Sequence, residues 1–296
     1  EKTEVAEAIY EHYLPGFAGD RLPSSPVGDI VSMADRLDTI VGCFGVGLVP
    51  TGTADPFGLR RHALGIIRII LEKKYSLSLR QLIEESGNLL KQKMERSFVE
   101  VKKEVLDFFR ARYQNLFLDR GYPLDVLEAV FSVSFDDLLD VRRRIDALNR
   151  ARNLEDIKSI VIAFKRAMNI LKAVPSEKKM SPTASGRKFR LITIEPHPEV
   201  GATQKKGIDP SLFSEPAEHN LYKSFQEVEA AVKPLLRDGF YDGSIDEMTK
   251  MRGPIDDFFN GVMVMVEDEA VRNNRLALLD EIGQLFLKVA DFSKLA

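Results

Sequence analysis

The fold class of this chain is decided by one stretch, MERSFVEVKKEVLDFFRARYQNLFL, residues 94–118. Steps of three or four residues place side chains on one face of an α-helix. Apolar residues recur at such steps, with one arginine on the same stripe: Phe98, Val101, Val105, Phe109, Arg112 and Leu116. The stretch therefore predicts a long amphipathic helix, ending near Gly121 and Pro123.

The same periodicity, interrupted by proline and glycine, runs through most of the remaining sequence. Asp55-Pro56 is expected to start a helix, because Asp caps helices and Pro is favoured at their first position. Further helices are expected at residues 3–14, 27–48, 78–90, 123–132, 135–151, 153–172, 215–237, 244–250, 254–265 and 268–292. The sequence thus predicts an all-α protein.

One region departs from this helical pattern. Residues 174–209 are rich in proline, glycine and polar residues, which is typical of a loop. Within them, KFRLITIE at residues 188–195 alternates polar and apolar side chains. Alternation with a period of two indicates extended backbone. We therefore expect one short β-strand or hairpin near 188–195.

Charge is unevenly distributed along the 296 residues. The whole chain carries a net charge of −3, with 29% charged and 44% hydrophobic residues. Residues 1–90 carry −3 and 211–296 carry −7, whereas 91–172 carry +4 and 173–210 carry +3. A basic middle in a mildly acidic protein permits a local surface for a polyanion.

Several classes of protein are disfavoured by composition. The single cysteine, Cys43, excludes a disulfide framework and a cysteine-rich zinc site. No signal peptide or membrane-spanning run is seen, so a cytoplasmic protein without a membrane partner is expected. The chain begins with Glu1 inside a helical pattern, which suggests a piece of a longer protein.

No arrangement of residues suits catalysis. The glycines between Gly42 and Gly52 lack the preceding strand and the Gly-Lys-Ser/Thr ending of a phosphate loop. No serine lies in a nucleophile elbow. His12 and nearby aspartates such as Asp35 are residue types that a metal phosphohydrolase of the HD type uses, but the chain has no His-Asp dipeptide. We expect no catalytic residue and no bound metal.

The basic residues of the middle region are the better candidates for a function. The planar guanidinium of arginine suits phosphate and base-edge contacts, and a tyrosine can stack on an unpaired base. The candidates chosen on this ground are Arg110, Arg112, Tyr113, Arg142 and Arg143. A solvated charged helix face is the competing interpretation, because acidic residues are interleaved with them.

Two long stretches resemble a known family. VAEAIYEHYLPGFAGDRLPSSPVGDIVSMADRLDTIVGCFGVGLVPTGTADPFGLRRHALGIIRI, Val5 to Ile69, is similar to the β subunit of the bacterial heterotetrameric glycine–tRNA ligase. PIDDFFNGVMVMVEDEAVRNNRLALLDEIGQLFLKVADFSKL, Pro254 to Leu295, resembles the end of the same subunit. The resemblance covers essentially the whole chain.

This resemblance implies a domain order. Residues 1–92 would be a partial HD-like helical domain, in which His12 and Asp35 occupy degenerate HD-like positions. Residues 93–152 would be connecting helices. Residues 153–296 would be a DALR-type anticodon-binding helical bundle, with a loop insertion at 174–209.

The resemblance also implies partners and contacts. The partners would be glycine tRNA and the ligase α subunit in an α2β2 assembly, with no DNA. ATP and magnesium would be held only by the α subunit, so no cofactor is expected here. Candidates for tRNA contact by motif are Lys165, Arg166, Arg272, Asn273, Asn274 and Arg275. For Arg275, a structural role is as well supported as a tRNA contact, namely an ion pair with an acid at 267–269 that braces the helices.

Two rival functions remain open. One is a degenerate HD-type metal phosphohydrolase, against which the missing His-Asp dipeptide argues. The other is an assembly module that contacts the α subunit. The apolar run Val262 to Val266 is a possible contact surface for such a module, although core packing is the favoured interpretation of this run.

Overall fold

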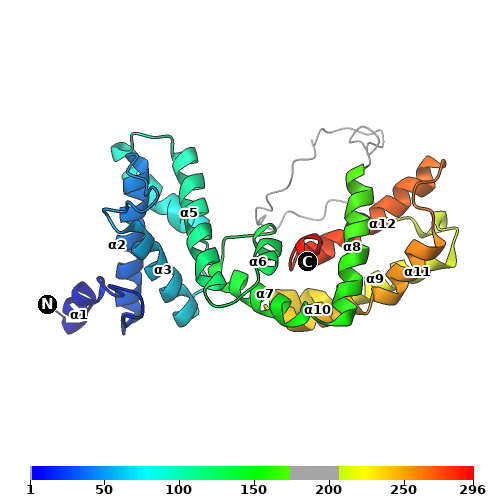
Figure 1. Cartoon of the computed structure of the whole chain (residues 1–296), viewed down its shortest axis with the longest axis horizontal. Helices are drawn as coiled ribbons and strands as arrows, with labels where there is room; N and C mark the ends of the chain where they lie inside the picture. The colour runs from blue at the N-terminus through cyan, green and yellow to red at the C-terminus, as the bar shows by residue number, and fades with distance from the viewer. Residues whose placement is uncertain (1, 174–206) are drawn as a thin grey trace. The chain divides into compact units, whose positions relative to one another are not determined.

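The computed structural model describes residues 2–173 and 207–296, and in these ranges it is built of helices without a sheet. Extended pairing in the described residues is limited to two isolated bridges, Thr51 with Ala54 and Ser78 with Asp137. The all-α prediction is confirmed (Figure 1). The strand or hairpin expected near 188–195, and the loop expected at 174–209 up to residue 206, lie outside the described residues.

The chain divides into two compact units. The N-terminal unit comprises Glu1–Tyr122 and Phe135–Arg142, and the C-terminal unit comprises Pro123–Ser134 and Arg143–Ala296. The three domains expected from the resemblance, with inner boundaries after residues 92 and 152, stay a prediction.

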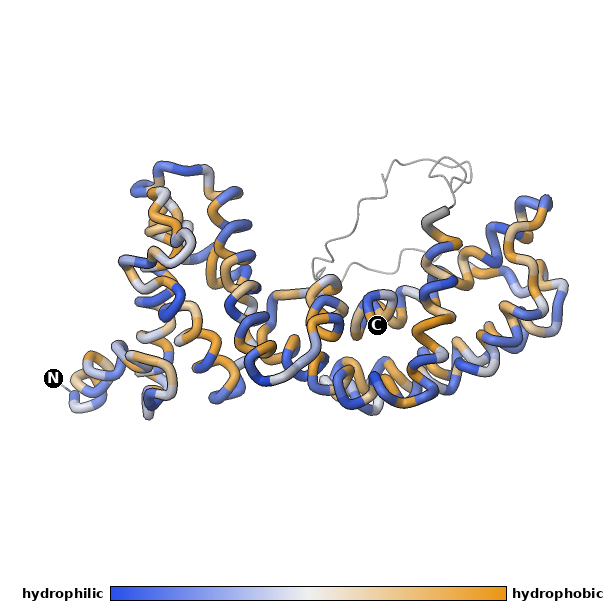
Figure 2. The backbone as a smooth tube through the Cα atoms, viewed as in Figure 1, coloured by the Kyte–Doolittle hydropathy of each residue, from blue (hydrophilic) through white to orange (hydrophobic). Residues whose placement is uncertain are grey.

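The N-terminal unit is centred on α2 (Pro26–Gly45). This helix packs against four others, which are α1 (Thr3–Glu11), α3 (Leu59–Lys73), α4 (Leu79–Leu90) and α5 (Phe98–Leu118). A 3-10 turn at Lys91–Lys93 follows α4. Figure 2 shows hydrophobic and hydrophilic residues alternating along these helices, as amphipathic helices require.

Capping residues set where the helices of this unit begin. The Ser25 hydroxyl accepts a hydrogen bond from Gly28 N at the start of α2, and Pro26 is its first residue. The Asp55 carboxylate accepts from Leu59 N and Arg60 N at the start of α3. That helix begins at Leu59, so the predicted start at Pro56 is wrong. Asp55 caps it across a turn, with Gly58 in the left-handed region at φ 65°.

The long helix predicted at residues 94–118 is α5 (Phe98–Leu118). Its buried face agrees with the predicted apolar stripe in the first half of the helix and differs from it in the second half. Val101, Val105 and Phe109 are fully buried as expected. The face then continues in steps of four through Tyr113 and Phe117, both 0% exposed, and not through Arg112 and Leu116. The rings of Tyr113 and Phe117 stack at 4.6 Å, with Phe135 edge-on to Tyr113 at 5.6 Å.

The C-terminal unit is a bundle of helices and two 3-10 turns. Its elements are α6 (Leu124–Phe131), most of α7 (Leu138–Ala151), α8 (Glu155–Ala173), α9 (Pro216–Arg237), α10 (Tyr241–Thr249), α11 (Arg252–Gly261), α12 (Glu269–Leu287), and the turns Pro210–Leu212 and Phe292–Lys294. In α8 the predicted apolar stripe is buried at Ile157, Ile160, Val161, Phe164 and Leu171. The last helix ends at Leu287, earlier than predicted, although Val289 and Phe292 beyond it are buried.

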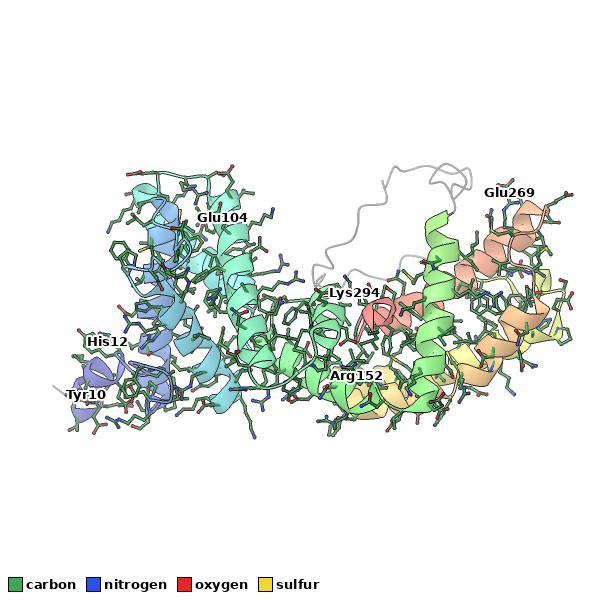
Figure 3. The ribbon with its side chains drawn as sticks, viewed as in Figure 1. Tyr10, His12, Glu104, Arg152, Glu269 and Lys294 are labelled. Carbon is green, nitrogen blue, oxygen red and sulfur yellow. The ribbon has the colours of Figure 1, made fainter. Side chains whose placement is uncertain are left out.

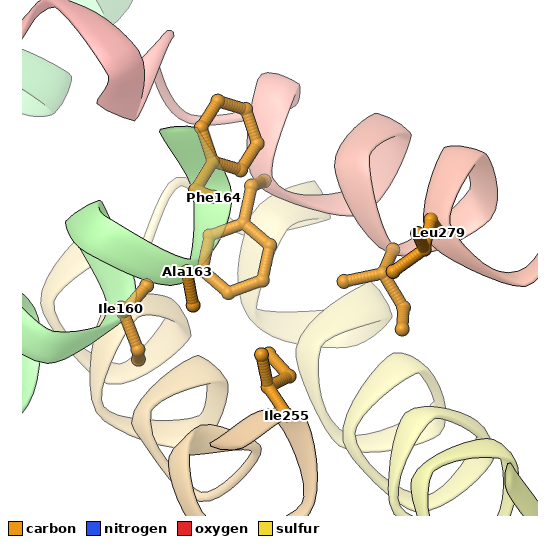
Figure 4. Close-up of a pocket in the computed structure, with 7 residues that line it drawn as sticks. Ile160, Ala163, Phe164, Ile255 and Leu279 are labelled. Carbon is orange, nitrogen blue, oxygen red and sulfur yellow. The ribbon is translucent and has the colours of Figure 1, made fainter. Parts of the chain in front are cut away.

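The centre of this bundle is tightly packed. Ile160, Ala163 and Phe164 of α8 face Ile255 and Leu279 across a small gap (Figure 4). The cavity measures about 10 Å³ and is lined only by apolar side chains. A space of this size holds one water at most, so it is a packing gap and not a ligand site.

Candidate nucleic-acid interface

Lys165 and Arg166 are neighbours on α8, and both contact other segments of the C-terminal unit. Lys165 is half-buried, and its Nζ donates to the carbonyl oxygen of Leu295 at 2.7 Å. The Arg166 guanidinium lies 4.6 Å from the centroid of the Phe259 ring, and its Nη2 donates to Phe259 O at 3.3 Å. Arg166 is nevertheless exposed, so part of its charged group can reach a phosphate.

The segment Arg272 to Asn274, at the start of α12, is partly occupied by internal contacts. Arg272 is half-buried, and its Nη1 donates to the carbonyl oxygens of Val266 and Glu267. Asn274 is 6% exposed, and its amide exchanges two hydrogen bonds with the Asp209 backbone, at 2.8 and 2.9 Å. Asn273 is half-buried. The polar groups of Asn274 are therefore used within the fold.

Arg275 is buried in an ion pair, and its predicted partner is wrong. Its Nε and Nη2 donate to Glu218 Oε1 and Oε2 at 2.8 and 2.9 Å, whereas the expected partner was an acid at 267–269. The guanidinium also donates to Met263 O and Ser214 Oγ. Arg275 is 4% exposed and Glu218 0%, so this guanidinium cannot reach RNA in this structure.

Glu218 is held ionised by its neighbours. Burial alone raises the pKa of a carboxyl group, but hydrogen bonds from Arg275 and from the backbone of Ser214 and Glu215 outweigh it and lower the pKa. The carboxylate forms a capping box with Glu215 at the start of α9. One acid thus caps the start of α9 and binds Arg275 within α12.

Three consecutive arginines of α7 have different environments. Arg144 is 2% exposed and donates to the carbonyl oxygens of Ser134 and Val289. Arg143 is exposed, and its Nη1 lies 3.0 Å from the point where a Cβ of Gly239 would stand. Arg142 is half-buried in the N-terminal unit. Arg143 is therefore the best placed of the three for a phosphate contact.

Phe240 is a candidate that the sequence reasoning missed. It follows Gly239 in the turn between α9 and α10, and its side chain is 65% exposed. Because Gly239 lies against Arg143, an exposed ring and an exposed guanidinium occupy the same part of the C-terminal unit. An aromatic residue next to a glycine in a short connection between helices was the available sequence signal.

Tyr113, in the N-terminal unit, is the clearest correction among the candidates. Its side chain is 0% exposed, and its hydroxyl donates to Leu138 O at 2.8 Å. A ring packed between Phe117 and Phe135 cannot stack on a base, so the predicted stacking role is wrong for this structure. Tyr113 is a core residue of α5.

The remaining candidates of the N-terminal unit are half-buried. The Arg112 guanidinium lies 5.8 Å from the Phe108 ring centroid, and its Nε is buried without an acceptor in the described residues. Arg110 and Arg142 are also half-buried. Their charged groups are therefore less available than that of Arg143.

The degenerate HD-like positions do not meet in a metal centre. His12 follows α1, where Figure 3 labels it beside Tyr10, and its Nδ1 lies 2.5 Å from Ile9 O. Asp35 is exposed on α2. Within residues 2–173 and 207–296, no three His, Cys, Asp or Glu side chains are grouped so as to hold a metal ion. Over the same residues no helix is long and apolar enough to cross a membrane.

Comparisons with known proteins place the C-terminal unit in a defined class. Residues 197–291 match the family model described as the DALR anticodon binding domain. The matched region contains Phe240 and Arg272 to Arg275, but it begins after α8, which carries Lys165 and Arg166. This match assigns the chain to the helical proteins that carry an anticodon-binding domain.

The particular family follows from the rest of the chain. Residues 1–132 match the family model of the glycyl-tRNA synthetase beta subunit. Proteins named "Glycine--tRNA ligase beta subunit" from Trichlorobacter lovleyi, Syntrophus aciditrophicus and Syntrophotalea carbinolica are 45%, 43% and 41% identical over the whole chain. The chain is similar to glycyl-tRNA synthetase beta subunits along its whole length, and it spans 39% of the length of each of these relatives.

Proposed function

We propose that this chain is the part of a glycine–tRNA ligase β subunit that holds the anticodon arm of glycine tRNA. The observation that carries the proposal is the DALR match over residues 197–291. The whole of this chain aligns with part of these β subunits. In this role the chain supports glycyl-tRNA formation in the cytoplasm without transferring the amino acid itself. ATP, glycine and magnesium would bind to the α subunit of an α2β2 enzyme.

The exposed groups of the C-terminal unit suggest how the RNA is held. Arg143 and Arg166 offer guanidinium groups to phosphates, which position an RNA without reading its sequence. Phe240 offers a ring on which an unpaired base of a loop can stack. The buried pair Arg275 and Glu218 then acts indirectly, because it fixes the start of α9 and the first turns of α12.

The direct test is titration of the chain with glycine tRNA and with an unrelated tRNA at several salt concentrations. Each phosphate contact adds about 0.9 to the slope of log affinity against log salt for duplex and about 0.7 for single strands. We expect preferential binding of glycine tRNA that weakens as salt rises. Equal affinity for both tRNAs, or no binding, would contradict the proposal.

Substitutions separate phosphate contacts from stacking. Arg143→Gln should weaken binding of both tRNAs and reduce the salt slope by about one contact. Phe240→Leu should lose about 1–3 kcal/mol of binding free energy, whereas Phe240→Tyr keeps a ring and should retain it. Lys223→Gln on α9 is the control for charge, since Lys223 is also an exposed cation.

A second candidate function is assembly with the α subunit, and one observation favours it. In the run from Val262 to Val266, Val262 and Val264 are buried, whereas Met263 and Met265 are 73% and 52% exposed. Exposed methionines are typical of adaptable protein contacts. Met263→Ser with Met265→Ser should reduce capture of the α subunit and leave tRNA affinity unchanged if this surface serves assembly.

A further inference from the structure

A cavity of about 310 Å³ lies in the N-terminal unit, and none of its lining residues belongs to residues 197–291, which match the DALR model. It is bounded by the loop Pro15–Gly19, by one face of α3 and by the end of α5. Binding sites for small ligands have volumes of about 300–1,000 Å³. The side chains that line it beyond the loop are Arg61, Leu64, Arg68, Leu116 and Arg120, with Gly65 between the two arginines of α3.

Positive charge dominates the wall of this cavity. Arg61 and Arg68 are seven residues apart and share one face of α3, while Arg120 follows the last turn of α5. No acidic residue is among the lining residues. Glu72 pairs with Arg68 Nε at 3.1 Å, but its own side chain is 51% exposed and outside the lining. The cavity therefore presents an excess of guanidinium groups.

Arg68 has a donor atom that the protein leaves unused. Its Nη2 donates to Asp20 O at 2.9 Å and its Nε to Glu72. Its Nη1 is buried and has no acceptor in the part of the chain that the structure describes. A buried donor without an acceptor costs free energy, so the protein itself compensates the charge of this lining arginine only in part.

The loop that closes the cavity is fixed before any ligand arrives. The buried Arg36 donates from Nη2 to Tyr13 O and Pro15 O, both at 2.9 Å. Gly16 N donates to the Asp20 carboxylate at 2.7 Å, so the far end of the loop is tied back to its start. A site that needs little ordering loses less free energy on binding.

The apolar part of the lining adds a surface for a ring. Leu64 and Leu116 are half-buried, and Phe17 on the loop is 67% exposed. A ligand that suits this cavity thus combines an anionic group for the arginines with a planar or apolar group for Phe17 and the leucines. Inorganic anions meet the first requirement only.

We propose that this cavity binds the phosphate group of a nucleotide, with the base or sugar against Phe17. Planar guanidinium groups form paired, charge-assisted hydrogen bonds to phosphate oxygens. The phosphate can belong to a free mononucleotide or to an RNA strand. The proposal goes beyond the tRNA-holding function, because that function places RNA contacts on the C-terminal unit.

Calorimetric titration of the whole chain with AMP, with inorganic phosphate and with a short single-stranded RNA tests the proposal. AMP should bind more tightly than inorganic phosphate, since Phe17 contacts only the nucleotide. Saturation by AMP with RNA binding that Arg61→Gln and Arg120→Gln leave unchanged identifies a free nucleotide as the ligand, and RNA binding that these changes weaken identifies an RNA phosphate. Absence of binding by all three probes overturns the proposal.

Variants locate the binding. Arg61→Gln with Arg120→Gln should weaken AMP binding about tenfold for each arginine lost, and Arg61→Lys with Arg120→Lys should retain part of the binding. Arg60→Gln is the control, because Arg60 lies on the same helix but donates to Gly52 O and Ala54 O outside the cavity. Unchanged AMP affinity in the glutamine pair overturns the assignment.

Two further measurements distinguish a loss of ligand binding from a loss of folding. AMP should raise the melting temperature of the original chain more than that of the Arg61→Gln single variant, which serves if the pair fails to fold. Binding of glycine tRNA through Arg143 and Phe240 should survive the Arg61→Gln change. In the original chain, AMP binding without tRNA binding contradicts the tRNA-holding function alone, whereas tRNA binding with no effect of Arg61→Gln and Arg120→Gln on any probe contradicts the cavity site alone. A melting temperature that AMP raises equally in both proteins contradicts the cavity site.

Discussion

Arg275 Nε lies 2.8 Å from Glu218 Oε1, and both side chains are shielded from solvent in the C-terminal unit. The two residues are 57 positions apart, on α12 and α9. Removing one partner of such a pair leaves an uncompensated buried charge. The pair therefore determines stability more than the surface ion pairs of the same unit do.

Arg275→Ala is expected to lower the free energy of unfolding by about 3–5 kcal/mol. The reason is that Glu218 would keep its charge in a buried place with fewer donors. Chemical denaturation followed by circular dichroism measures the change. The control is Arg150→Ala, because Arg150 and Asp242 are 60% and 57% exposed and such a pair contributes about 1 kcal/mol or less. Equal losses in the two variants would show that burial of the pair does not matter.

The same pair predicts how stability depends on pH. Hydrogen bonds from Arg275 and the backbone, working against burial, lower the pKa of Glu218 from its ordinary 4.5. A group with a lowered folded pKa stabilises the fold above its unfolded pKa and loses this contribution as the pH falls through the folded value. The melting temperature should therefore decrease below about pH 4.5, and the decrease should be smaller in Glu218→Gln.

Other acids of the chain contribute to the same acid transition. The pKa of Glu11 is lowered by hydrogen bonds from Ser24, and that of Glu104 by Arg96. These groups are present in both proteins, so the difference between the two pH profiles reports Glu218 alone. Profiles that stay parallel between pH 3 and 6 would mean that Glu218 binds no extra proton on unfolding.

The predictability of α5 shows where sequence periodicity stops being sufficient. Steps of three and four fixed the face at Val101, Val105 and Phe109, and these residues are buried. Beyond Phe109, one choice of step leads to Arg112 and Leu116 and the other to Tyr113 and Phe117. Packing against Phe135 and the backbone of Leu138 decides between them, and these residues are distant in sequence.

The candidate site was less predictable than the fold for a related reason. Residue type identifies an arginine as a possible phosphate ligand, but burial decides whether it is available. Arg143 and Arg144 are neighbours in sequence, yet only Arg143 is exposed. The partner of Arg275 was out of reach of local reasoning, because a search near α12 does not include Glu218.

Tyr113→Phe separates the core role of this residue from the role in RNA binding that its sequence position suggested. The change removes the hydrogen bond to Leu138 O and leaves a buried carbonyl without this donor. We expect a loss of about 1 kcal/mol of unfolding free energy and an unchanged affinity for glycine tRNA. A fall in tRNA affinity at unchanged stability would instead place the ring in contact with RNA.

Gly87 and Gly42 make a matched pair of helix-interior glycines with opposite expected effects. A Cβ at Gly87 of α4 would overlap the Phe98 ring, whereas a Cβ at Gly42 of α2 would meet only Leu90 Cδ1, at 3.6 Å. Gly87→Ala should therefore cost about 1–3 kcal/mol through overpacking. Gly42→Ala should stabilise by up to about 1 kcal/mol, because alanine favours helix more than glycine.

Thermal and chemical unfolding of the two alanine variants measure this contrast. Adding Phe98→Leu to Gly87→Ala relieves the overlap, so the double variant should be more stable than the two separate changes predict. Additive losses would show that the ring does not limit this position. A stabilised Gly87→Ala would contradict the close packing of α4 against the start of α5, which holds the N-terminal unit together around α2.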